Sequence, residues 1–396
     1  MQVRDFRLER LARSLLLFVC CALTLLFAVQ FVADLSVSGP IGGDLAITAN
    51  ATKALASTVS RAFNNLMTMV LAFIALAVPI TANMYTPRLI EIFVRDRVNL
   101  VVLLFYALMG ANAVFVQALG LDQWAPRVMY LVLAVSGVIG FAILIPYYLY
   151  VLSFLDPDRI IERVTERIIR EYDGIAKGGR PIGELQNRLH ERIHHLGNVI
   201  LRSVDRADRD VALSAIEALR RAVEAYAEPK RTAPAAWFDV RRDIYVGLSK
   251  EAIDIAVRER VWVERRCLSQ LLLAYESSLT RMTDAISAIS QTNRKIAVHA
   301  AREGDSALVR LCVRFFNTYL RSALRRKDMH AVNDVLYQYR LFAQQVLPHD
   351  APAAVEVARH FRYYAEFARF QGMSFVYELV CSELGQVAES AFDSAS

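Results

Sequence analysis

The stretch that decides the fold runs from Val128 to Tyr172 and reads VMYLVLAVSGVIGFAILIPYYLYVLSFLDPDRIIERVTERIIREY. Residues 128–154 carry no charged side chain and are long enough to cross a bilayer as one helix. Asp156 then suits a helix N-cap, with a proline at the first helical position and Asp158 complementing the helix dipole. The stretch therefore predicts that a membrane-embedded half gives way here to a charged helical half.

The composition of the whole chain supports this division. The 396 residues are 55% hydrophobic with a mean hydropathy of +0.30, which is high for a soluble protein. Residues 1–154 contain only 10 of the 46 Lys and Arg residues and 7 of the 40 Asp and Glu residues. We therefore expect a transmembrane domain at 1–155, a helical domain at 156–390 and a disordered tail at 391–396. The charges of the second domain are of mixed sign and form no basic stripe, so nucleic acid is not an expected partner.

Four apolar runs are long enough to span a membrane, at residues 14–35, 63–85, 98–119 and 128–154. Arginines gather before the first run, between the second and third, and after the fourth, whereas the other two loops hold few basic residues. Because basic loops stay on the cytoplasmic side, this pattern predicts that both termini are cytosolic.

The second run carries a stripe of small and polar residues. They are separated by steps of three and four, which places them on one helix face: Asn65, Thr68, Ala72, Ala75, Pro79 and Asn83. Close packing against another helix is the favoured interpretation, because small residues let helix backbones approach. The lining of a pore in an oligomer is the alternative.

The segment that follows, Met84 to Leu100, reads MYTPRLIEIFVRDRVNL. It resembles the signature of an uncharacterised family of bacterial predicted membrane proteins. In that family a Ser/Thr-Pro-Arg-Leu step ends the second span, and an Arg-Asp-Arg precedes the third. The resemblance covers about residues 50–120 and implies a bacterial inner-membrane protein of no particular activity. Arg88, Arg95 and Arg97 are then expected to anchor the loop at anionic lipid headgroups.

The second half contains a long regular pattern. No proline lies between Pro234 and Pro348, and apolar positions from Leu268 to Ala300 alternate in steps of four and three. This predicts one very long helix, or two, in a bundle. Asn293 falls at a heptad position where a buried amide fixes register, so it is a candidate for setting the register of an oligomer. Residues 328–343 also echo residues 350–365, and paired helices of this kind often form protein-binding surfaces.

One motif suggests an enzyme. His190-Glu191-Arg192-Ile193-His194 matches H-E-x-x-H, in which two histidines one turn apart bind zinc and the glutamate activates water. The position of a third histidine ligand holds Ile200, and the histidines lie at the edge of an apolar stripe. A solvated helix edge is therefore favoured over a zinc site, and no other catalytic motif or cofactor site is present in the sequence.

Together these features predict an all-α protein, with four transmembrane helices followed by a cytosolic helical bundle with long helices. We expect a non-enzymatic, homo-oligomeric protein of the bacterial inner membrane whose cytosolic domain is a scaffold for an unidentified protein partner. An oligomeric ion channel lined by the second span is one alternative. A zinc metallopeptidase that uses His190, Glu191 and His194 is the other.

Overall fold

The computed structural model describes residues 18, 21–34, 36, 49–84, 93, 96–118, 127–177, 181–240, 250–279 and 281–393. Across these ranges the regular elements are all helices, in agreement with the all-α prediction. The chain divides into two compact units. The first comprises residues 1–83 and 87–155, and the second comprises residues 84–86 and 156–396.

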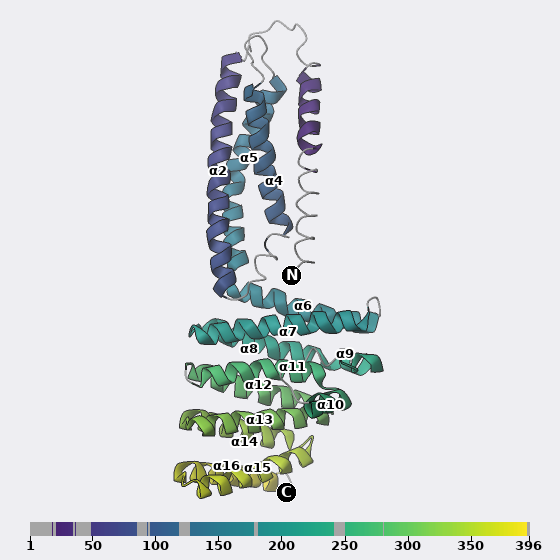
Figure 1. Cartoon of the computed structure of the whole chain (residues 1–396), viewed down its shortest axis with the longest axis vertical. Coiled ribbons are helices and arrows are strands. Elements are labelled where there is room, and N and C mark those ends of the chain that lie inside the picture. The colour runs from purple at the N-terminus through teal and green to yellow at the C-terminus, as the bar shows by residue number, and fades with distance from the viewer. Residues whose placement is uncertain are drawn as a thin grey trace. The chain divides into compact units, whose positions relative to one another are not determined.

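The first unit contains three described helices that are long and apolar enough to cross a membrane (Figure 1). They are α2 (Ala49–Met84), α4 (Arg97–Ala118) and α5 (Arg127–Leu155), and they match the second, third and fourth predicted spans. Within the first predicted span, the helix Cys21–Asp34 is apolar but shorter than a full crossing. Most of the remainder of that span lies outside the described residues.

Specific polar contacts hold the first unit together. The Asp34 carboxylate accepts hydrogen bonds from the backbone N–H groups of Val128 (2.8 Å) and Met129 (3.2 Å), so it caps the start of α5. The Tyr106 hydroxyl of α4 donates to the Gly140 carbonyl of α5 at 2.7 Å. Polar groups in an apolar unit are costly unless they are paired, so these bonds fix how the helices pack.

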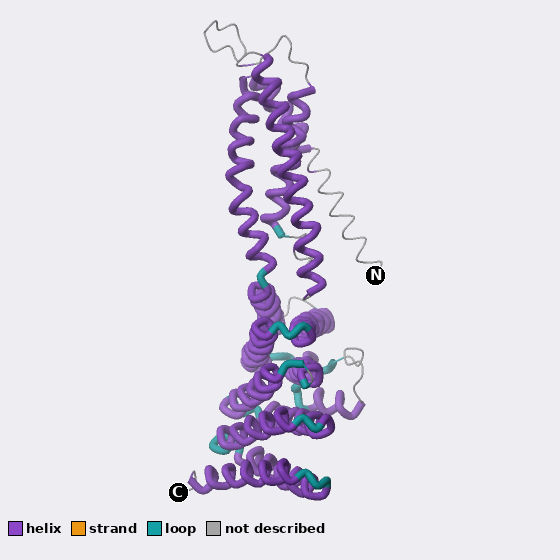
Figure 2. Tube along the Cα trace, turned by 90° about the vertical axis from the view of Figure 1, so that its left-hand side faces the viewer, coloured by secondary structure: helices purple, strands orange, loops and turns teal. Residues whose placement is uncertain are grey.

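The second unit is a stack of helices in two layers (Figures 1 and 2). It opens with α6 (Pro157–Lys177), and shorter elements lie between α8 and α11: α9 (Ala227–Thr232), η1 (Ala235–Trp237) and α10 (Lys250–Arg258). In one layer each helix packs on the next in the order α7 (Ile182–Asp205), α11 (Trp262–Ser278), α13 (Ser306–Arg326) and α15 (Ala351–Phe370). The other layer runs α8 (Arg209–Ala225), α12 (Thr283–Arg302), α14 (Met329–Val346) and α16 (Ser374–Asp393). This is the arrangement of a helix-pair solenoid.

The last three helix pairs form a tandem repeat of about 45 residues. Their first helices begin at residues 262, 306 and 351, and their second helices at 283, 329 and 374. Tyr275, Tyr319 and Tyr364 hold the same buried position in the three first helices, at intervals of 44 and 45 residues. The rings of Tyr275 and Tyr319 lie 4.6 Å apart, so equivalent residues of neighbouring repeats touch.

The turns between helices reuse one device. A residue in the left-handed conformation ends one helix, and the aspartate after it accepts a hydrogen bond from the first turn of the next helix. The aspartate caps are Asp208, Asp305 and Asp328, which follow the positive-φ residues Ala207, Gly304 and Lys327. Asp350 caps α15 with the same hydrogen bond, without a left-handed residue before it. These caps set where each helix begins and so keep the repeats in step.

The prediction of one or two long helices between Pro234 and Pro348 was wrong. α11 ends at Ser278 and α12 begins at Thr283, and two further helices follow before Pro348. The apolar spacing continues across this turn because both helices bury their stripes against the same core, so the spacing does not reveal the break. At the other end, α16 continues to Asp393, into the segment expected to be a tail.

Candidate functional site

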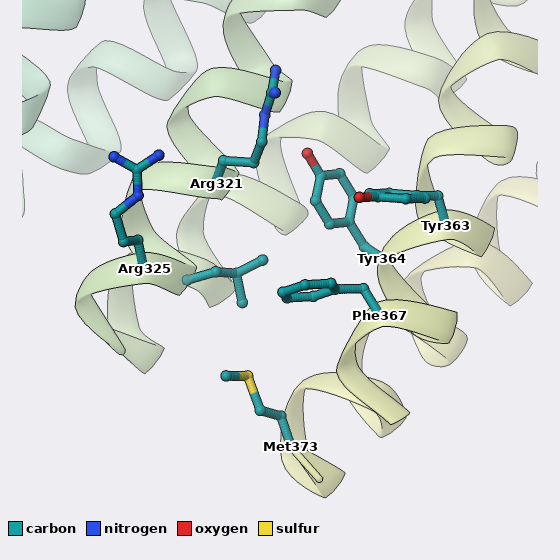
Figure 3. Close-up of a pocket in the computed structure, with 7 residues that line it drawn as sticks. Arg321, Arg325, Tyr363, Tyr364, Phe367 and Met373 are labelled. Atoms are coloured by element: carbon teal, nitrogen blue, oxygen red, sulfur yellow. The ribbon is translucent and has the colours of Figure 1, made fainter. Parts of the chain in front are cut away.

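A pocket bordered by arginines lies between α13 and α15, with a volume of about 350 Å³ (Figure 3). Two arginines come from α13, and the aromatic residues come from α15. The lining residues are Arg321, Leu324, Arg325, Tyr363, Tyr364, Phe367 and Met373. In Figure 3 the Phe367 ring points across the pocket towards α13, and Met373 closes one end. The pocket thus combines an apolar floor with two guanidinium groups on its rim.

Hydrogen bonds beneath this pocket hold its walls in place. The Tyr364 hydroxyl and the Arg321 Nε both donate to the Asn317 carbonyl, each at 3.2 Å. The Asn317 side chain and the Tyr339 hydroxyl both lie 3.0 Å from His360 Nδ1, which links α13, α14 and α15. Burial lowers the pKa of His360, so the network uses a neutral imidazole near neutral pH. The pocket is therefore built on a fixed scaffold.

Neither rim arginine has a carboxylate partner among the described residues. By contrast, the described residues contain many other arginines within 4 Å of a carboxylate, such as Arg281, Arg314 and Arg340. The rim of the pocket therefore carries positive charge that the described part of the chain does not neutralise.

A second charged cluster lies between α9, α11 and α13. Lys230 Nζ is 2.6 Å from Glu264 Oε1 and 2.5 Å from Asp305 Oδ2. Burial opposes the charge on Lys230, but the two carboxylates outweigh it and raise the pKa of the lysine. Burial raises the pKa of Glu264, although Lys230 opposes this shift. Because Asp305 also caps α13, the cluster joins three helices and acts as a structural clamp.

The H-E-x-x-H segment lies on α7, whose apolar stripe is buried as predicted. Arg192 pairs with Glu171 of α6 at 2.6 Å, which explains a charge inside the motif. Burial, followed by the nearby charge of Arg266, lowers the pKa of His190 to about 4 and also lowers the pKa of His194. A neighbouring guanidinium repels a metal cation, and the described residues contain no group of three possible metal ligands. Glu191 and His194 are exposed, His190 and Arg192 are partly buried and Ile193 is buried, so the motif lies along the edge of the packed face of α7.

Gly197, which would extend the peptidase motif, has a packing role. A Cβ atom at this position would lie 2.6 Å from Cδ and Cγ of Gln270 on α11. Ordinary contacts are longer than 3.4 Å. The glycine therefore permits the close approach of α7 and α11.

The predicted stripe on α2 is largely exposed in the described part of the first unit. Asn65, Thr68, Ala72 and Ala75 are exposed and Pro79 is half-buried, while the buried face of α2 includes Phe63, Val70 and Val78. The side chain of Asn83 lies outside the described set. Among the described residues, larger apolar side chains and not this stripe form the interface within the unit, and packing of the stripe against another helix stays a prediction.

The loop arginines and the register asparagine have different outcomes. Arg88 and Arg95 lie outside the described residues, and Arg97 is exposed at the start of α4. Asn293 is fully buried and donates from Nδ2 to the Cys312 carbonyl of α13 at 3.0 Å. It therefore pairs within the chain, and burial removes it from any contact with a second subunit.

No role was predicted for Asp96, the middle residue of the Arg95-Asp96-Arg97 motif. The Asp96 carboxylate accepts hydrogen bonds from the N–H groups of Val98 (3.1 Å) and Asn99 (3.3 Å), which caps α4. It also accepts one from the Tyr150 hydroxyl of α5 at 2.7 Å. An aspartate directly before an apolar run is an N-cap signal that could have identified it.

The structure thus defines a helical protein with membrane-capable helices in one unit and a helix-pair repeat in the other. A family described as "Predicted membrane protein (DUF2254)" matches residues 9–216, and the chain belongs to this family. The match covers the first unit and extends into α8, so the three tandem repeats lie beyond it. Comparison with curated proteins and with solved structures yields no match.

Proposed function

We propose that this membrane protein is a non-enzymatic scaffold, in which the first unit anchors the chain in the bilayer and the helical repeats bind a protein partner. The observation that carries the proposal is the tandem repeat of helix pairs from Trp262 to Asp393. In such solenoids each repeat contacts only its neighbours, which leaves extended surfaces free for binding.

The proposed location is the bacterial inner membrane, with both chain ends and the repeat unit in the cytosol. The arginine-rich loops and the charged residues after the fourth apolar run support this orientation. A reporter enzyme fused to the C-terminus tests it. Activity of a cytosolic reporter is expected, and activity of a periplasmic reporter at that end would contradict the orientation.

Site-specific photo-crosslinking in living cells tests the scaffold proposal. A photoreactive amino acid is placed at the exposed repeat positions Tyr337 and Tyr363, one variant at a time. Positions in the described cores, such as Tyr339, serve as buried controls. We expect discrete adducts with another protein from at least one exposed position and none from the buried control. Absence of adducts at all exposed positions along the repeats would overturn the proposal.

We propose further that the protein forms a homo-oligomer through the stripe on α2, and that a channel is the second candidate function. The exposure of Asn65 and Thr68 on the outer face supports both, because polar side chains favour a helix or water over lipid. Single-channel recording in planar bilayers tests the channel, and Asn65→Asp should change its ion selectivity. Purified protein that shows no conductance under voltage or tension would end the channel proposal.

A further inference from the structure

We propose that the pocket between α13 and α15 binds an acidic peptide segment of the partner, in which a large apolar side chain lies next to an aspartate or glutamate. This inference rests on the proposed scaffold function and names the chemistry of the partner. The apolar side chain would fill the pocket, and the neighbouring carboxylate would bind the guanidinium groups of Arg321 and Arg325.

The floor of the pocket supports the apolar part of the ligand. Phe367, Met373 and Leu324 offer carbon and sulfur surface, and the hydroxyl of Tyr364 is already used by the Asn317 carbonyl. Tyr363 lies beside them and is 56% exposed. Exposed apolar side chains are common when they are isolated, whereas exposed apolar side chains that lie together mark a binding surface. Transfer of a large apolar side chain into this space removes apolar surface of both partners from water.

The rim of the pocket supports the carboxylate. Arg321 is held by its bond to the Asn317 carbonyl, so its guanidinium is partly pre-ordered before any ligand binds. Arg325 has no partner among the described residues. Two guanidinium groups can bind a carboxylate with paired, charge-assisted hydrogen bonds, which are about twice as strong as neutral ones.

An earlier repeat shows what these two positions hold. In the register set by Tyr275 and Tyr319, Arg321 corresponds to Ser277 and Arg325 to Arg281, which follows the end of α11. There the Ser277 hydroxyl and the Arg281 guanidinium both bond to Oδ1 of Asp205, at 2.7 and 2.6 Å. The earlier repeat thus binds a carboxylate on the preceding helix α7, whereas in the later repeat the two arginines have no carboxylate within ion-pair distance among the described residues.

The same observations favour a peptide over other anions. Lipid headgroups and RNA present phosphates along a polar surface, and proteins meet RNA with long basic stripes and stacked bases. Here two arginines border an apolar cavity of about 350 Å³, which a phosphate group alone would not fill, and Arg326 and Lys327 continue the positive charge at the end of α13. An apolar side chain beside one or two carboxylates matches that layout.

The test uses the full-length protein in detergent micelles and two fluorescein-labelled peptides, GSDEFDEGS and its amide counterpart GSNQFNQGS. Fluorescence anisotropy measures binding. We expect saturable binding of the acidic peptide, weaker binding as salt is raised, and no saturable binding of the amide peptide. Arg321→Gln with Arg325→Gln should weaken binding at least about tenfold, because the charged hydrogen bonds to the peptide carboxylate are lost. Phe367→Ser should weaken it as well.

Arg310→Gln is the matched control. Arg310 is an exposed arginine on the same helix, has no carboxylate partner among the described residues and is not part of the pocket. This variant should bind the acidic peptide like the unmodified protein. Circular dichroism of every variant checks that the helices are retained, so that a loss of binding is not a loss of folding.

Several results would overturn the inference. They are no saturable binding of the acidic peptide, equal binding of the amide peptide, or equal losses in Arg310→Gln and in the double variant. Binding of phosphatidylglycerol vesicles or polyuridine RNA that needs Arg321 and Arg325, without peptide binding, would also overturn it. Cross-links from other exposed repeat positions would then still support the scaffold, whereas their complete absence would overturn the scaffold itself.

Discussion

Replacement of Lys230 by methionine should destabilise the second unit more than any surface substitution. Methionine keeps much of the length of the side chain but removes the charge. The Lys230 side chain is 13% exposed, and that of its partner Glu264 is 2% exposed. Removal of one partner of a buried ion pair costs about 3–5 kcal/mol, because the other charge is left in a medium of low polarity. Asp305 is closer to water at 26% exposed, so it adds less to the cost.

Urea unfolding of the full-length protein in a mild detergent measures this effect. Trp237 and Trp262 are buried in the second unit, so their fluorescence reports its unfolding. Lys230→Met should lower the free energy of unfolding by about 3–5 kcal/mol. The double variant Lys230→Met with Glu264→Gln should regain much of this loss, because the only carboxylate of the cluster then left unpaired is Asp305, which is 26% exposed.

The control is Arg362→Met, which breaks an ion pair with side chains that are 78% and 65% exposed. Its effect should stay within about 1 kcal/mol, since exposed pairs contribute little. The reasoning fails if Lys230→Met costs no more than this control. It also fails if the double variant is no more stable than Lys230→Met alone.

Three further predictions concern single contacts. The pKa of His190 falls from 6.5 to about 4 on folding, so the unfolded chain takes up the proton first as pH is lowered. The free energy of unfolding should therefore fall as pH is lowered from 6.5 towards 4, and His190→Gln should reduce this dependence in urea titrations. Gly197→Ala should destabilise by about 1–2 kcal/mol, because overpacking against Gln270 exceeds the gain in helix propensity, and Gln270→Ala in the same chain should relieve it. Tyr150→Phe should lower the thermal stability of the first unit in detergent by about 1.5 kcal/mol or more, because it removes the bond to Asp96. Equal melting of the two proteins would exclude that role.

Parts of the fold follow from the sequence by simple physics. Apolar runs long enough to cross a bilayer locate α2, α4 and α5, because few other structures bury such runs. In the sequence the repeat was visible only as a similarity between two segments offset by 22 residues, which is half the true repeat length. The two segments are α14 and α15, which resemble each other because both have an aspartate cap and similar apolar spacing. The turn after Ser278 was invisible to apolar spacing, although a cluster of serines and threonines marks it.

The candidate site was harder to predict. Arg321 and Tyr363 lie 42 residues apart, and only the stacking of α13 on α15 brings them together. The signal that could have found it is the interval between Tyr275, Tyr319 and Tyr364, which aligns the repeats and exposes the change at Ser277. The peptidase motif has the spacing of a zinc site, but burial, and then the charge of Arg266 on α11, lowers the pKa of His190, and the spacing alone does not reveal this.

The repeat architecture also allows binding at the pocket to be tested separately from folding. Because a solenoid is stabilised mainly by contacts between neighbouring repeats, a substitution at the rim of one pocket should affect few of the contacts that stabilise the rest of the core. Arg321 and Arg325 are exposed and make no ion pair among the described residues, so their replacement removes one local hydrogen bond, from Arg321 Nε to the Asn317 carbonyl, and no ion pair. Phe367 is half-buried and supports the α15 packing, so Phe367→Ser tests binding less cleanly. A binding loss in the arginine variant with unchanged urea unfolding would therefore place the effect in recognition and not in folding.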